Sequence, residues 1–410
     1  MSRTKVTVSN LHQIDPPDGG ARLRLLGLYG NLGDDLDVTY VGSYQNPDSP
    51  PRKIKIREHL KEIDIPLGNE YWEKHSILSS HANNWCWDAA FPLYGNLSKK
   101  YVDTVKKHIK KSDIAVISSP WIFNHVYQSL QEHQLIVYDS QNFEGLLNLK
   151  LYGEENDITR AIVREVVRSE YELCHMADCI ITCLQDDSDK FIEYYGVKQE
   201  KISVFENGAF SDKLQPCTDQ HVREHLRAKY GLTSPTIVFM GSAYNPNVEA
   251  ARLLLDLSEQ MQDFQFVLLG GLKKALTDID FTNFNNVIAP GFVEEREMNE
   301  YLWASDMAVN PITTGSGSNV KMYEFMSAGL PIITTEVGSR GIENANNSTY
   351  EISTIEDLEL TIRNTISNPE RMKLLSKTAR IELCNKYDWN KISERLGRYF
   401  LEKLELKRNK

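Results

Sequence analysis

Residues 315–335, GSGSNVKMYEFMSAGLPIITT, contain a loop of glycine and serine, a short predicted helix, a glycine that should end it, and an apolar strand. This order is typical of a site that holds a diphosphate, because free backbone N–H groups and the positive end of a helix dipole attract an anion. The amides come from four consecutive residues, Ser316, Gly317, Ser318 and Asn319. Lys321, in the first turn of the helix, adds a full positive charge.

Lys321 and Glu324 lie three residues apart, so both should project from one face of this helix. We expect Lys321 to contact the phosphates and Glu324 the ribose hydroxyls of one nucleotide. The alternative is an ordinary helix with a solvated ion pair between the two side chains, which is the commoner outcome for a lone glycine-rich loop.

Further segments accompany this loop in a regular order. They are HQIDPPDGGARLRLLGLYGNL at 12–32, LIVYDSQNFE at 135–144, KISVFENGAF at 201–210, TIVFMGSAYNPNVEAARLLL at 236–255 and NVIAPGFVEEREMNEYLWASDMAVNP at 286–311. Together with residues 315–335 they resemble the retaining glycosyltransferase family four, within the GT-B fold class.

The resemblance implies an α/β protein with two doubly wound Rossmann-like domains facing a central cleft. Residues 1–207 would form the acceptor-side domain, 208–385 the nucleotide-sugar-binding domain, and 386–410 a helix that crosses back toward the first domain. The implied activity is metal-independent transfer of a hexose from a nucleoside-diphosphate sugar, with retention, to a glycan or lipid-linked acceptor, in bacterial-type polysaccharide or glycoconjugate synthesis. The donor is the substrate, and no separate cofactor is implied.

The resemblance also assigns roles to single residues. Lys321 and Glu324 would be catalytic, and the donor would contact Gly19, Gly20, Gly241, Ser316, Gly317, Ser318, Asn319 and Arg340. Weaker sugar contacts are implied for Asp139, Gln141 and Asn142.

Three departures from the family pattern change these roles. Ser316 stands where the first of two family glutamates is expected, and Gln141 stands where a family histidine would contact the sugar. Since glutamine does not titrate, no proton transfer is assigned to Gln141. The loop GSAYNPN at 241–247 lacks the Arg and Lys of many members, so Lys321 and Arg340 should carry the phosphate charge.

Two other functional classes remain open. A nucleotide-sugar epimerase can share the fold but should carry additional acid and base residues, and a noncatalytic sugar-binding protein would need no catalytic group. The motifs DLD at 35–37 and DID at 278–280 lie outside a nucleotide-binding context and are rejected as metal sites. The cluster of Cys174, Cys179 and Cys183 beside His175 could suggest a metal site. We expect reduced, buried thiols instead, because Cys174 and His175 lie at a predicted helix end and Cys179 and Cys183 bracket a strand, so the side chains should not converge.

Composition restricts the partners. The chain has 410 residues, 41% of them hydrophobic, which is enough for two cores, and its formal net charge of -11 argues against nonspecific nucleic-acid binding. No stretch approaches the roughly 18 apolar residues of a membrane span, and the start MSRTKVTVSN lacks an apolar signal core. We therefore expect a cytoplasmic protein.

A lysine-rich segment, LSKKYVDTVKKHIKKSD at 97–113, suggests contact with a membrane. Val102, Val105 and Ile109 form an apolar stripe on a predicted helix whose remaining surface is basic. Such a helix could lie on the anionic inner face of the membrane. The alternative is that the stripe packs on its own domain, since it lacks the aromatic anchors of an interfacial helix.

Elsewhere apolar runs alternate with helical patterns, which predicts parallel sheets covered on both faces. The predicted strands are 5–9, 38–41, 114–118, 136–138, 180–183, 237–240, 265–269, 287–289, 307–310 and 331–334. A C-terminal amphipathic helix is expected at 387–407. The segment 44–100 has the least regular pattern and is interpreted as surface loops. These loops would either contact the acceptor or form a packed structural excursion.

Overall fold

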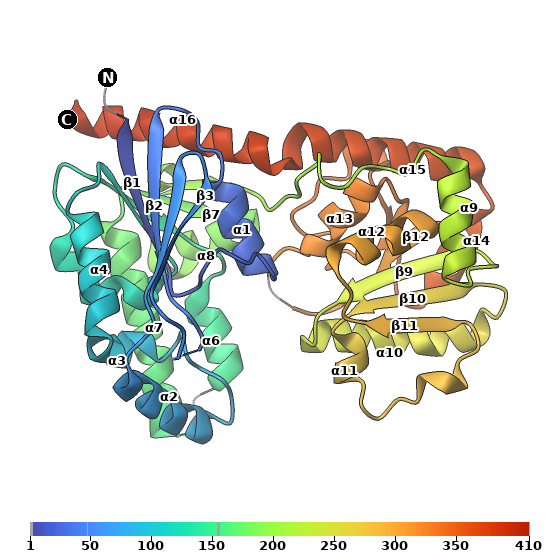
Figure 1. Cartoon of the computed structure of the whole chain (residues 1–410), viewed down its shortest axis with the longest axis horizontal. Coiled ribbons are helices and arrows are strands. Elements are labelled where there is room, and N and C mark those ends of the chain that lie inside the picture. Colours follow the sequence, from blue (N-terminus) through green and yellow to red (C-terminus); the bar gives the residue numbers. More distant parts are fainter. Residues whose placement is uncertain (1–2, 47, 154–155, 316, 410) are drawn as a thin grey trace. The chain divides into compact units, whose positions relative to one another are not determined.

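The chain forms two compact units in a computed structural model that describes residues 3–46, 48–153, 156–315 and 317–409 (Figure 1). Unit 1 comprises Met1–Glu206 and Asn390–Lys410, and unit 2 comprises Asn207–Trp389. Each unit has its own sheet, mostly parallel in unit 1 and entirely parallel in unit 2, and its own buried apolar core.

The sheet of unit 1 has the strand order β3-β4-β2-β1-β5-β6-β7-β8. Its strands are β1 (Thr4–Ser9), β2 (Leu36–Gly42), β3 (Arg52–Arg57), β4 (Leu60–Asp64), β5 (Ile114–Ser118), β6 (Leu135–Asp139), β7 (Cys179–Thr182) and β8 (Ile202–Val204). All neighbours are parallel except β3 and β4. Strands β5 and β6 are buried along their whole length, because helices cover both faces.

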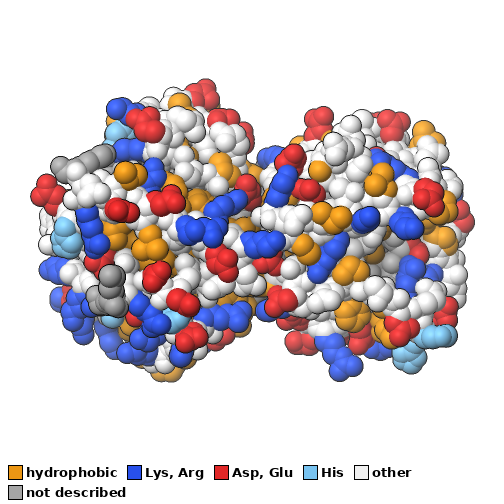
Figure 2. Space-filling view, turned by 90° about the horizontal axis from the view of Figure 1, so that it is seen from above, with side chains coloured by type: hydrophobic (Ala, Val, Ile, Leu, Met, Phe, Trp, Pro, Cys, Tyr) orange, Lys and Arg blue, Asp and Glu red, His pale blue; other side chains and the backbone are white. Residues whose placement is uncertain are grey.

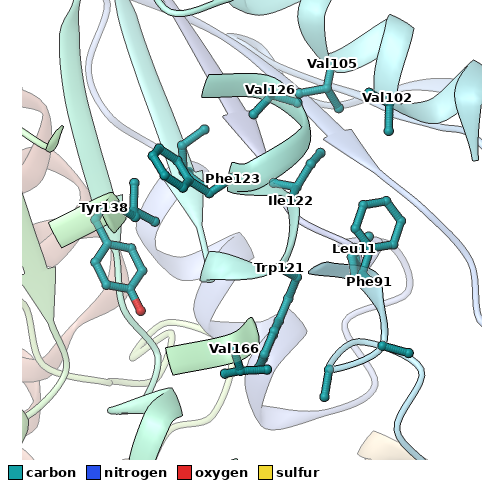
Figure 3. Packing of buried hydrophobic residues seen from close by; sticks show 14 of the residues in the cluster. Leu11, Phe91, Val102, Val105, Trp121, Ile122, Phe123, Val126, Tyr138 and Val166 are labelled. Carbon is teal, nitrogen blue, oxygen red and sulfur yellow. The ribbon is translucent and has the colours of Figure 1, made fainter. Parts of the chain in front are cut away.

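The helices of unit 1 connect these strands and cover the sheet. They are α1 (Gly20–Tyr29), α2 (Asn69–Ala82), α3 (Phe91–Tyr94), α4 (Lys99–Ile109), α5 (Phe123–Val126), α6 (Glu144–Tyr152), α7 (Asp157–Met176) and α8 (Gln185–Tyr195). Val102 and Val105 of α4 point into the core, toward Ile122 and Val126 (Figure 3). The apolar stripe of the lysine-rich segment therefore packs on its own unit, as the second of the two alternatives predicted.

The region interpreted as irregular contains a β-hairpin. Its strand β3, RKIKIR, alternates half-buried and exposed residues, which is the period of a strand with one covered face. Arg52 binds the buried carboxylate of Asp64 with Nε at 2.9 Å and Asp15 with Nη1 at 3.0 Å. The hairpin thereby holds the loop that leads from β1 to Gly19 and Gly20.

The sheet of unit 2 is entirely parallel, with the order β11-β10-β9-β12-β13-β14. Its strands are β9 (Thr236–Gly241), β10 (Gln265–Gly270), β11 (Val287–Gly291), β12 (Met307–Asn310), β13 (Ile332–Thr334) and β14 (Glu351–Ile352). The chain moves from β9 toward one edge and then from β12 toward the other. Ligands of such doubly wound sheets bind outside the carboxyl ends of the strands where the direction reverses, here between β9 and β12.

The helices of unit 2 are α9 (Gln220–Lys229), α10 (Asn245–Gln260), α11 (Leu272–Ala275), α12 (Glu295–Ala304), α13 (Val320–Ala328), α14 (Leu358–Ile366) and α15 (Pro369–Glu382). Every strand predicted from an apolar run overlaps an observed strand. The hairpin β3–β4, strand β8 and the two-residue β14 were not among the strands predicted from apolar runs.

The last helix, α16 (Trp389–Arg408), packs from residue 390 onward on unit 1. Its residues Ile392, Leu396 and Phe400 are buried, and Ser393 Oγ donates to the carbonyl of Leu28 at 2.7 Å. On the face that carries α16, basic and acidic side chains are interspersed (Figure 2). Within the described residues, none of the helices combines the length and the apolar character needed to cross a membrane.

Candidate functional site

The glycine-rich segment lies at the carboxyl ends of β9 and β12, where unit 2 reverses its direction. Helix α13 begins after Asn319 and ends at Gly329, whose φ of 70° is a left-handed conformation that favours glycine. A Cβ at Gly329 would also lie 2.8 Å from Cγ of Pro216. The predicted short helix and its glycine stop are confirmed.

Lys321 is partly buried beneath the start of this helix. Its Nζ donates to Oδ1 of Asn247 at 2.5 Å and lies 4.4 Å from the centre of the Phe239 ring. In the part of the chain that the structure describes, no carboxylate forms an ion pair with this ammonium. Burial without a counter-charge lowers the pKa of Lys321 to about 7.

Glu324 is also partly buried, but it faces other elements than Lys321 does. Its pKa is raised to about 7, mainly by burial and also by the Glu295 carboxylate, while Lys213 acts in the opposite direction. Within the described residues its carboxylate has no hydrogen-bonding partner and no ion pair with Lys321. The alternative of an ordinary solvated Lys–Glu pair is therefore wrong, and the predicted contacts of both residues with a nucleotide stay predictions.

The loop before α13 is held by side chains that contact its backbone. Arg340 donates to the carbonyl of Gly315 at 2.9 Å with Nη2 and to that of Val337 at 3.1 Å with Nε. Ser318 Oγ accepts from Asn207 Nδ2 at 2.6 Å, and Asn319 Nδ2 donates to Val337 O at 3.2 Å. Arg340 thus positions the loop, and its predicted contact with phosphate stays a prediction.

The backbone amides of this loop are available for an anion. Gly315 and Gly317 have φ values of +119° and +70°, and Ser316 lies outside the described residues. Among the described residues, no acceptor takes the N–H groups of Gly317, Ser318 and Asn319. They lie at the N-terminus of α13, where the helix dipole favours negative charge.

Gly241, at the end of β9, makes room for the residue that holds Lys321. A Cβ at Gly241 would lie 2.8 Å from Cβ of Asn247, and Asn247 itself is 8% exposed. The structure therefore brings Gly241, Lys321 and the described residues of the loop before α13 into one region, with Arg340 at its edge.

The other predicted site residues belong to unit 1. Gly19 is the N-cap of α1, and a Cβ there would meet nothing within 4 Å, so the diglycine turn borders open space. Asn142 Nδ2 donates to Oε1 of Glu144 at 3.3 Å, and Nε2 of Gln141 is enclosed without a partner among the described residues.

Asp139 is placed differently from the predicted sugar contact. Its carboxylate is fully buried and accepts from Tyr29 at 2.7 Å and Ser118 at 2.8 Å, with Arg24 Nη2 3.7 Å away. These bonds join α1, β5 and β6 within unit 1. These bonds stabilise the buried carboxylate, and the predicted sugar contact of Asp139 stays a prediction.

Several residues of the site were not found from the sequence. Asn247, Phe239 and Lys213 contact or face the two residues of α13, and Phe292, after β11, is 81% exposed at the same edge of the sheet. The run NPN at 245–247 directly after a strand and a glycine was the available signal for Asn247.

The rejected metal motifs and the cysteines have other roles. Asp278 pairs with Arg252 at 2.7 Å, and Asp280 caps the turn at Thr282. Cys174, Cys179 and Cys183 are buried free thiols, and burial raises the pKa of the latter two to about 12. Among the described residues, no group of three or more His, Cys, Asp or Glu side chains is arranged to hold a metal ion.

Comparisons with solved structures define the fold class. The chain aligns over 98% of its length with all of sucrose-phosphate synthase from Thermosynechococcus elongatus, at a TM-score of 0.73 and 16% identity. It aligns over 97% with all of Anabaena HepE in complex with UDP, at a TM-score of 0.67 and 14% identity. The fold is GT-B, as predicted.

Comparisons of sequence show which proteins the chain resembles. Residues 234–368 match the model described as glycosyl transferases group 1. Spore coat protein SA of Bacillus subtilis (strain 168) is 27% identical over 199 residues, which is 43% of this chain and 52% of that protein, so the match spans about half of the relative. These matches support the resemblance to GT-B glycosyltransferases, and the matched segment lies within unit 2.

Proposed function

We propose that this protein transfers a hexose from a nucleoside-diphosphate sugar to an acceptor hydroxyl, with retention and without a divalent metal. Unit 2 binds the donor and unit 1 the acceptor, a glycan or a lipid-linked glycan of bacterial-type polysaccharide or glycoconjugate synthesis. Lys321 stabilises the departing diphosphate, and Glu324 binds the ribose hydroxyls.

The observation that carries this proposal is the state of Lys321. A partly buried ammonium without a carboxylate partner is unfavourable for folding, and it lies beside unpaired backbone amides at the N-terminus of α13. An anion bound there would accept hydrogen bonds from the amides and would neutralise the ammonium. Preorganised positive charge of this kind stabilises the charge that grows on a leaving group.

The similar proteins support the class of donor. HepE of Anabaena was solved with UDP and with UDP-glucose, and the trehalose-6-phosphate protein of Escherichia coli with UDP-2-fluoro glucose. By analogy we propose a nucleoside-diphosphate sugar as the donor of this chain.

Peripheral membrane contact through α4 is a second part of the proposal. Its apolar stripe is buried, so the contact would be electrostatic, through the exposed Lys107, Lys110 and Lys111. Such lysines attract anionic headgroups without inserting apolar side chains.

The test is a transfer assay in two stages. A panel of nucleotide sugars is first screened by thermal shift, and stabilising donors are then incubated with glycan and lipid-linked acceptors. NMR of the product gives the anomeric configuration, and retention is expected. Conversion of a donor into its epimer in the absence of acceptor would instead identify an epimerase, and binding without turnover would identify a sugar-binding protein.

A further inference from the structure

Asn247 is the polar side chain nearest to the Lys321 ammonium. It lies in the first turn of α10, is almost fully buried, and accepts from Lys321 Nζ at 2.5 Å. Its own amide nitrogen donates to Oγ of Ser242 at 3.2 Å, which fixes the orientation of the side chain. The absence of a side chain at Gly241 leaves the space that Asn247 occupies.

The charged groups around Lys321 are engaged elsewhere. On α10, Glu249 accepts from Thr314 and Asn245; on the loop after β13, Arg340 is bonded to backbone carbonyls. On its own helix, Glu324 faces Glu295 and Lys213. The acceptor that reaches Lys321 is thus an amide, which holds the ammonium but does not neutralise it.

We propose that Asn247 is the positioning residue of the donor site, holding Lys321 Nζ for the diphosphate through a neutral acceptor that does not compete with the diphosphate for the lysine charge. This inference rests on the proposed donor site and adds a proton linkage to it. A carboxylate at the same position would pair with Lys321 permanently and would compete with the diphosphate. An apolar side chain would leave the ammonium without a partner.

The linkage has a defined direction. In the free protein burial holds the pKa of Lys321 at about 7, so at pH 8 the amine is roughly nine-tenths neutral. A bound diphosphate raises this pKa, so binding at pH 8 takes up about one proton. Affinity should therefore fall roughly tenfold for each pH unit above 7.

The test measures the affinity of UDP from pH 6 to 9 by calorimetry, with proton uptake obtained from two buffers of different ionisation enthalpy. Pyrophosphate is used in parallel as a probe without a base. Asn247→Asp should move the midpoint of the pH dependence of UDP binding upward by at least about one pH unit, reduce proton uptake at pH 8 to about half a proton or less, and weaken binding at pH 6. Asn247→Leu should move the midpoint downward.

Two variants make the result specific. Asn245→Asp adds the same charge two residues away, at an exposed position that does not contact Lys321, and should keep the wild-type midpoint. Lys321→Ala removes the titrating group, so the pH dependence that remains in this variant is the one caused by ionisation of UDP itself. Damage to the fold would weaken binding at every pH but would not move the midpoint in opposite directions for Asp and Leu.

Each outcome decides between two ideas. If Asn247→Asp and Asn247→Leu both keep the wild-type midpoint while Lys321→Ala loses it, Lys321 binds diphosphate but Asn247 does not control it, and this inference is overturned. If Lys321→Ala itself binds UDP with wild-type affinity and pH dependence, the proposed donor site is wrong.

Discussion

At the scale of single residues, the site depends on two groups whose charges are suppressed in the free protein. Burial moves the pKa of Lys321 down and that of Glu324 up, both to about 7. Neither shift arises from an ion pair between them. Such values are typical of groups that are desolvated in advance of binding a ligand.

The first prediction separates the roles of the two residues. Lys321→Ala should lower turnover by roughly a hundredfold or more, because it removes charge that acts mainly on the departing diphosphate. Glu324→Ala should instead raise the apparent donor constant and weaken UDP binding, because ribose contacts are made in ground state and transition state alike. Steady-state kinetics and calorimetry check both.

The second prediction concerns stability. Lys321→Met should not lower the melting temperature, because the folded protein disfavours the charged lysine. The unfolded chain binds this proton up to about pH 10 and the folded chain only up to about pH 7, so wild-type stability rises with pH across that window. The melting temperature of the Met variant should therefore exceed that of the wild type by a margin that grows as pH falls from 10 to 7. Melting curves across this range are the measurement, and a constant difference would contradict the assigned pKa.

At the scale of elements, α4 and α13 differ in which of their side chains are buried. The apolar residues of α4 are buried in unit 1, while several of its lysines are exposed. In α13 the two charged residues, Lys321 and Glu324, are partly buried, and the N–H groups of Gly317, Ser318 and Asn319 before it have no acceptor among the described residues. We therefore assign surface attraction to α4 and ligand binding to α13.

The third prediction tests α4. Replacing Lys106, Lys107, Lys110 and Lys111 with Gln should weaken binding to vesicles containing anionic lipid by at least on the order of a hundredfold, since each lysine contributes about 1 kcal/mol. UDP binding should not change. Vesicle flotation is the measurement.

A matched control compares two double variants. The test variant carries Lys107→Gln and Lys110→Gln, and the control carries Lys373→Gln and Lys377→Gln, two exposed lysines on α15. Only the α4 pair should reduce flotation. Equal loss from both pairs, or no flotation of the wild type, would remove the membrane contact.

At the scale of the whole molecule, each unit has its own sheet with its own helices, and the C-terminal end of the chain belongs to unit 1. Helix α16 contributes buried residues to that unit, with Gly397 against the backbone of Leu32. The proposed donor and acceptor roles fall on two units of one chain, each with its own core.

The fourth prediction is that transfer persists in excess EDTA, because the proposed site opposes the diphosphate charge with Lys321 and backbone amides. Activity with and without EDTA, and after adding magnesium or manganese, is compared. Near-complete loss that either metal restores would refute the metal-independent site.

The fifth prediction concerns the return of the chain. Gly397→Ala should destabilise the protein by at least about 2 kcal/mol, because a Cβ there would collide with the carbonyl oxygen of Leu32. Arg398→Ala, one position along on the exposed side of α16, should have little effect. Denaturant unfolding gives both values. A Gly397→Ala variant as stable as the control would contradict the close packing of α16 described here.

Much of the architecture follows from local patterns in the sequence. Short apolar runs ended by Gly, Pro or Ser specify buried parallel strands, and the order of loop, helix and Gly329 specifies α13, because these features depend on neighbouring residues alone. The hairpin β3–β4 was missed although RKIKIR alternates, because its partner strand β4 has a weaker pattern of its own.

The sequence by itself therefore determined the strands, helix α13 and the resemblance that identified the family. Only the tertiary structure decided what the site residues contact. Lys321 meets Asn247, 74 residues away, Glu324 faces Lys213, and Asp139 is enclosed by Tyr29 and Ser118. Spacing along a helix tells which side chains share a face, but which of them are buried, and against what, depends on elements that folding brings together from distant parts of the chain.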